Sequence, residues 1–105
     1  MRKLRQRDIR VVLCTPAVIG EKRPGENEMD ASLEAYVRAC RAVAGREDCS
    51  PVDLRAAFTG YLWTHNPQNQ AKGTLTTDGV HLTREGNALV AREFTRFYFW
   101  RSSCD

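Results

Sequence analysis

Several features that would define a class of protein are missing from this sequence. No apolar run approaches the roughly 20 residues of a membrane-spanning helix, so no membrane span is predicted. Cys14, Cys40, Cys49 and Cys104 form no Cys-x-x-Cys pair and no cluster with histidine at zinc spacing. We therefore expect reduced, mostly buried thiols, a cytoplasmic location and no cofactor.

A strong excess of one charge is also absent. The chain has 16 Lys and Arg against 13 Asp and Glu, and four of the basic residues lie in its first seven positions, namely Arg2, Lys3, Arg5 and Arg7. Proteins that read nucleic acid usually carry a larger basic stripe with aromatic or motif support, so no nucleic-acid partner is predicted. A secretory signal is disfavoured as well, because the apolar run after this basic start is short and contains Pro16.

The first half of the chain alternates between extended and helical patterns. Residues 8–15 form an apolar run rich in β-branched residues, typical of a strand buried on both faces, and residues 49–54 form a second short strand. A polar loop at 20–28 separates the first strand from a helix, which Asn27 or Asp30 could cap and Gly45 could close. The helix is predicted from an apolar stripe made by Met29, Leu33, Tyr36, Val37, Cys40, Val43 and Ala44.

Two further helices are predicted in the second half. Residues 55–66 are helical in pattern, with Phe58 and Leu62 on the buried side, and residues 67–79 form a loop. The last helix begins at Thr83, a favourable N-cap, with Glu85 in its first turn. Its apolar face consists of Leu89, Val90, Phe94, Phe97 and Tyr98.

The order strand, helix, strand, helix, loop, helix predicts an α/β fold. We expect a single and incomplete domain over residues 1–105, a partial three-layer αβα (flavodoxin-like) sandwich with a short parallel sheet. A sheet of two strands is marginal, and open edges invite association. The aromatic residues Phe99 and Trp100 fall off the apolar stripe of the last helix, which adds a second candidate contact surface.

One short motif carries potential chemistry. Asp78 and His81 are three residues apart, close enough for their side chains to meet across one turn, and Gly79 between them permits a tight bend. A carboxylate that holds an imidazole is the base and orienter of serine-type hydrolases. The spacing alone instead favours a histidine that caps or packs under the helix while Asp78 binds loop amides. A metal pair lacks an evident third ligand, because His65 is expected to be a surface loop residue.

The sequence around this motif strengthens the interpretation of Asp78 and His81 as part of a serine-type hydrolase. The segments "VVLCTPAVIGE", "VDLRAAFTGYL" and "KGTLTTDGVHLTREGNALVA" resemble, in order, the C-terminal half of the SGNH hydrolases, the GDSL esterase and lipase family, over about residues 8–95. The sharpest element is D-G-V-H-L-T-x-x-G-N at 78–87. The resemblance implies that Asp78 and His81 are the acid and base of a Ser-His-Asp triad. It also relates Thr15 and Asp53 to family positions, although a strand end and a loop brace explain these two residues more simply.

The nucleophile block that the resemblance implies is not found in this sequence. The four serines are Ser32, Ser50, Ser102 and Ser103, and none stands in a Gly-Asp-Ser segment. We therefore expect an ester hydrolase fragment that is inactive alone and acts on an ester substrate only when a serine-bearing segment completes it. The alternatives are a non-catalytic remnant that associates through an open sheet edge and its aromatic C-terminus, and a complementing half whose serine lies on another chain.

Overall fold

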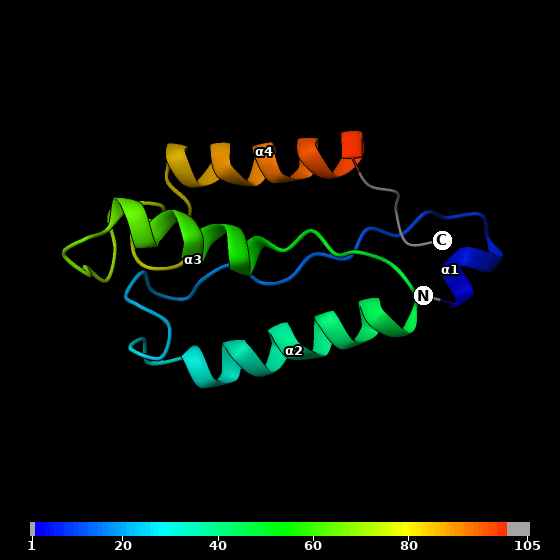
Figure 1. Ribbon diagram of the computed structural model, residues 1–105, viewed down its shortest axis with the longest axis horizontal. Coiled ribbons are helices and arrows are strands. Elements are labelled where there is room, and N and C mark those ends of the chain that lie inside the picture. Colours follow the sequence, from blue (N-terminus) through cyan, green and yellow to red (C-terminus); the bar gives the residue numbers. More distant parts are fainter. Residues whose placement is uncertain (1, 101–105) are drawn as a thin grey trace.

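Four helices make up the regular structure of the residues that the computed structural model describes, 2–100. They are α1 (Arg2–Gln6), α2 (Asp30–Arg46), α3 (Leu54–His65) and α4 (Arg84–Trp100). In Figure 1, α2 and α4 lie on opposite sides of a central part formed by α3 and extended segments of the chain. Of the helices, α3 and α4 pack against each other.

The predicted parallel sheet is wrong. Within residues 2–100 the backbone forms the isolated bridges Cys14 to Val52, which is parallel, and Thr76 to Leu82, which is antiparallel, but no named strand. The first bridge rests on two hydrogen bonds, from the Thr15 amide to the Val52 carbonyl (3.0 Å) and from the Val52 amide to the Leu13 carbonyl (2.8 Å). The three-layer αβα sandwich is therefore not formed by these residues.

Proline and helix boundaries explain why pairing stops after one bridge. Pro16 follows Thr15 and Pro51 precedes Val52, and neither proline has an amide hydrogen to donate to a ladder. On the other side of Val52, α3 begins at Leu54 and takes the backbone out of the extended conformation. The β-branched composition of residues 8–15 thus produces an extended segment without a sheet.

The helices agree with the periodic patterns better than the strands do. The predicted helices at 29–44, 55–66 and from Thr83 onward correspond to α2, α3 and α4. The predicted ends of α2 are wrong. The N-cap is Met29, which makes no side-chain capping bond, rather than Asn27 or Asp30, and the helix continues past Gly45 to Arg46. Thr83 does cap α4, since its hydroxyl accepts a hydrogen bond from the Gly86 amide at 3.1 Å.

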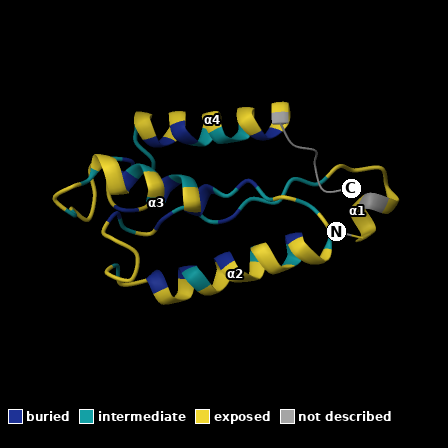
Figure 2. Cartoon of the chain, viewed as in Figure 1, coloured by how far each residue is buried: buried dark blue, intermediate teal, exposed yellow. Residues whose placement is uncertain are grey.

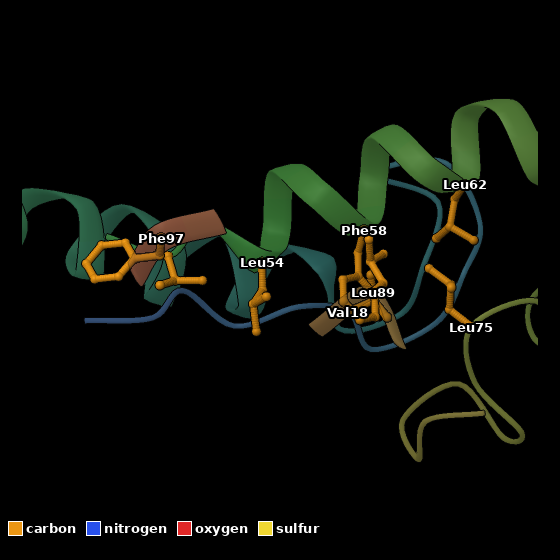
Figure 3. Close-up of a cluster of buried hydrophobic side chains, with 8 residues drawn as sticks. Val18, Leu54, Phe58, Leu62, Leu75, Leu89 and Phe97 are labelled. Carbon is orange, nitrogen blue, oxygen red and sulfur yellow. The ribbon is translucent and has the colours of Figure 1, made fainter. Parts of the chain in front are cut away.

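The core lies where α3 meets α4 and the extended segments. Figure 3 shows side chains from this cluster, which consists of Val18, Val52, Leu54, Phe58, Leu62, Leu75, Leu89 and Phe97. The predicted burial of Phe58 and Leu62 is confirmed. By contrast, Tyr36 and Tyr98 are about 70% exposed, at 71% and 70%, although both were assigned to apolar stripes. The outer faces of α2 and α4 are accordingly coloured as exposed in Figure 2.

The cysteines differ from the expected uniform set of reduced thiols. Cys14 and Cys40 are free, and burial is the main cause that raises the pKa of both thiols. Cys49, however, is disulfide-bonded, which corrects the prediction for that residue. Cys104, together with Ser102 and Ser103, lies outside the described residues.

Candidate functional site

Asp78 and His81 lie in a tight loop that leads into α4. The bridge between Thr76 and Leu82 closes this loop, and the Thr77 amide donates to the His81 carbonyl at 2.8 Å. Gly79 has a φ of +98°, a backbone conformation that residues other than glycine rarely adopt. This agrees with the tight bend expected at Gly79. Within the loop, Asp78 Oδ1 accepts hydrogen bonds from the amides of Val80 (2.9 Å) and His81 (2.8 Å).

The second carboxylate oxygen of Asp78 holds the imidazole. Nδ1 of His81 lies 2.6 Å from Asp78 Oδ2, and the side chains are 80% and 52% exposed, respectively. The pKa of Asp78 is held well below its usual range by the backbone amides of His81 and Val80 first, and then by the ring of His81. A charged carboxylate on Nδ1 favours the tautomer whose Nε2 is free to accept a proton.

The exposure of the His81 ring argues against packing of the ring beneath the helix. A histidine that packs beneath a helix would be buried, whereas this imidazole faces solvent over most of its surface. Within residues 2–100, no hydrogen bond occupies Nε2 of His81. Asp78 binds loop amides, as the alternative required, but it also binds the ring, so both contacts occur together.

A buried glutamate lies beneath this loop. Glu21 is 1% exposed, and its carboxylate accepts hydrogen bonds from the amides of Thr74 (3.0 Å), Leu75 (3.1 Å) and Thr76 (2.8 Å), and from the Thr76 hydroxyl. The Thr76 hydroxyl in turn accepts from the Gly79 amide at 2.9 Å. Sequence patterns did not single out Glu21, because its partners lie more than 50 residues away in a loop without periodicity.

Thr15 and Asp53 form a separate structural cluster. The Thr15 hydroxyl donates to Asp53 Oδ1 at 3.1 Å, Asp53 caps α3 by accepting from the Ala56 amide at 3.1 Å, and Arg41 binds both carboxylate oxygens. Burial opposes ionisation of Asp53, but the bonds from Arg41, Ala56 and Thr15 outweigh it and lower the pKa. These contacts agree with the expectation that Asp53 braces the backbone.

The remaining candidates are not assembled with the pair. His65 is the last residue of α3 rather than a loop residue, stacks on Tyr61 with ring centroids 3.9 Å apart, and pairs through Nδ1 with the Tyr61 carbonyl at 3.0 Å. Ser32 and Ser50 are exposed and form no hydrogen bond with His81. Over residues 2–100, no group of three or more His, Cys, Asp or Glu side chains is arranged to hold a metal ion.

A hollow lies on the Asp78 side of the pair. Its volume is about 340 Å³, and its wall includes Asp78, Gly79 and Val80 from the site loop and Ile19 and Met29 from the loop before α2. The side chains of Ile19, Met29 and Val80 are 37%, 46% and 53% exposed, so the hollow offers apolar surface next to the carboxylate.

The chain matches known hydrolases over most of its length. The sequence model of the GDSL-like Lipase/Acylhydrolase family matches residues 1–89. Among solved structures, the chain is similar to the crystal structure of an acetyl xylan esterase, AlAXEase, with 41% sequence identity and a TM-score of 0.85. The match covers 90% of this chain and 48% of that one, so the chain spans about half the length of the esterase. A comparison with curated proteins gives no match.

The described part of the chain contains no helix that is both long enough and apolar enough to cross a membrane. The motif at 78–87 and the matched range agree with the resemblance seen in the sequence. The chain belongs to the GDSL-like lipase/acylhydrolase family.

Proposed function

We propose that this chain supplies the base and the orienting acid of an ester hydrolase whose nucleophilic serine comes from a segment outside these 105 residues. The observation that carries the proposal is the 2.6 Å contact between His81 Nδ1 and Asp78 Oδ2 on an imidazole that is 80% exposed. An exposed Nε2 beside a fixed carboxylate is what a serine hydroxyl needs in order to be deprotonated.

In the completed site, Nε2 of His81 takes the proton of the serine hydroxyl as its oxygen attacks the ester carbonyl carbon. The resulting tetrahedral intermediate expels the alcohol, which receives the proton from His81, and leaves an acyl-serine. Water then repeats the sequence, with His81 again accepting and returning one proton, and releases the carboxylic acid. Asp78 holds the ring and stabilises its charged form throughout, and no cofactor enters the reaction.

Acetylated sugars are the first substrate class to test, because the similar structure is named an acetyl xylan esterase. Short acyl esters and lysophospholipids are further candidates. The alternative of a complementing half on another chain uses the same residues and differs only in where the serine resides. Absence of a nucleic-acid partner remains a prediction. A cytoplasmic location also remains a prediction.

A chimaera provides the decisive experiment. In the acetyl xylan esterase, the half that the match covers is replaced by this chain, and hydrolysis of 4-nitrophenyl acetate is measured. We expect turnover that a serine-directed reagent abolishes and that His81→Ala lowers by about 10⁶-fold, the scale of losing the histidine of a triad. The chain alone should show no reagent-sensitive turnover. A well-folded chimaera whose activity is unchanged by His81→Ala would contradict the proposal.

A non-catalytic interaction module is the second candidate, and exposed aromatic side chains favour it. Tyr98 and Phe99 at the end of α4 are 70% and 81% exposed, a combination that contact surfaces often show. The sheet edge no longer contributes, since the described residues form no sheet. Size-exclusion chromatography tests this candidate. A defined oligomer that Tyr98→Ser converts to monomer supports it, and a stable wild-type monomer argues against it.

A further inference from the structure

Glu21 occupies an unusual position for a carboxylate. Its side chain is 1% exposed, and no ion pair joins it to another residue within 2–100. A buried carboxylate is costly unless hydrogen bonds replace its water shell. Here three successive backbone amides and one hydroxyl, all from residues 74–76, supply that replacement.

The bonds lead from Glu21 to the candidate catalytic loop in two steps. The Thr76 hydroxyl donates to Glu21 and accepts from the Gly79 amide at 2.9 Å, which fixes the residue that follows Asp78. The Gly79 carbonyl then accepts from the Gly20 amide at 2.7 Å, so the residue before Glu21 is tied to the same turn. Gly79 has a φ of +98°, a backbone conformation that outside bonds can hold in place.

Most other hydrogen bonds of the loop are local, among them the bridge between Thr76 and Leu82 and the bond from the Thr77 amide to the His81 carbonyl. Asp78 and His81 are largely exposed, and the bonds between them are local to the turn. An exposed pair of this kind keeps a single geometry only if the backbone beneath it is rigid. Glu21 is the buried side chain that connects this backbone to a distant part of the chain, the loop before α2, together with the backbone bond from Gly20 to Gly79.

We propose that Glu21 is a positioning residue, which acts through Thr76 and Gly79 to hold Asp78 against the imidazole of His81. Its catalytic meaning rests on the proposed function, whereas its effect on geometry does not. The substitution Glu21→Gln is the sharpest perturbation. The amide keeps the size of the side chain but replaces one acceptor oxygen by a donor, so an N–H group must face the donors of residue 76 or those of residues 74 and 75.

The experiment uses the full 105-residue chain labelled with ¹⁵N and two NMR measurements. Hydrogen exchange of the Gly79 amide reports on the turn, and long-range correlations of the imidazole nitrogens report on the bond from His81 to Asp78. Neither group contacts Glu21. We expect Glu21→Gln to accelerate exchange at Gly79 by about 10- to 100-fold, the scale of one lost buried hydrogen bond. The ring signals should shift toward those of Asp78→Asn, which defines an imidazole without its carboxylate.

Matched controls separate positioning from general stability. Glu26→Gln removes a carboxylate of the same loop, one that accepts from Asn69 at 2.9 Å, and should leave both measurements unchanged. Exchange at Val37, in the buried face of α2, should also stay as in the wild type. Thr76→Val removes the connecting hydroxyl and should reproduce the effect of Glu21→Gln, while Thr76→Ser should restore wild-type behaviour.

Three results would overturn the proposal. These are ring signals of His81 that do not move in Glu21→Gln, exchange that rises equally at Gly79 and Val37, and unfolding of both Glu21→Gln and Thr76→Val. The last two would assign Glu21 to folding alone. Because the measurements involve no ester, a well-folded but inactive chimaera would refute the proposed function without touching this inference.

Discussion

Gly86→Ala should destabilise the protein even though alanine is the better helix former. Gly86 lies in the first turn of α4, and a methyl group there would stand 2.2 Å from the Leu75 carbonyl oxygen and 3.2 Å from Leu82 Cβ. Real side chains do not approach backbone oxygen so closely, so the helix or the segment around Leu75 must move. That carbonyl also accepts from the Thr83 amide at 2.8 Å, and movement weakens this bond.

The expected change in the free energy of unfolding for Gly86→Ala is the sum of opposing contributions. Replacing glycine by alanine within a helix stabilises it by about 1 kcal/mol. Overpacking against a fixed backbone costs about 1–3 kcal/mol, and loss of the backbone hydrogen bond adds about 1 kcal/mol. We therefore expect a net loss near 2 kcal/mol in the free energy of unfolding. For a domain of this size that corresponds to a fall in Tm of about 8–16 °C.

Thermal and urea unfolding followed by circular dichroism would measure the effect. Gly45→Ala in α2 and Gly60→Ala in α3 are matched controls, because a methyl group at either position meets no atom within 4 Å. Both controls should raise the free energy of unfolding by about 0.5–1 kcal/mol. A Gly86→Ala protein as stable as these controls would refute the reasoning, since the contact of α4 with Leu75 would then be loose.

Three further predictions concern groups away from the catalytic pair. Arg55 is 3% exposed, and its Nε lies 2.8 Å from Glu34 Oε1. Arg55→Ala should lower the free energy of unfolding, measured in urea, by about 3–5 kcal/mol, whereas Glu34→Gln should lower it by about 1 kcal/mol or less. The pKa of Asp53 is lowered in the folded state, so the contribution of Asp53 to stability is present above the unfolded pKa of about 3.9 and is lost as the pH falls. Asp53→Asn should therefore flatten the decline in the free energy of unfolding between about pH 4 and pH 2. A decline as steep as that of the wild type would count against the Arg41 contact. Thr83→Ala should cost about 1 kcal/mol through loss of the α4 cap, with Thr83→Ser as the control that retains the hydroxyl and loses little.

The helices could be predicted because their signals are local. Apolar residues spaced three and four apart, such as Phe58 and Leu62, require only neighbours on the same helix face to define an amphipathic element. The same holds for Thr83, whose capping bond reaches three residues along the chain. The strands could not be predicted in this way, because a strand forms only when it pairs with another segment. Pro16 and Pro51 limit the pairing of these two segments to one bridge.

By itself, the sequence determined the residue pair Asp78 and His81, the glycine between them and the family to which the chain belongs, since all three depend on short spacing and motif. Tertiary structure alone decided that the imidazole is exposed, and it alone brought Glu21 under the loop from 55 residues away. A hydrogen bond over that separation leaves no periodic trace, because its geometry depends on how the intervening helices pack.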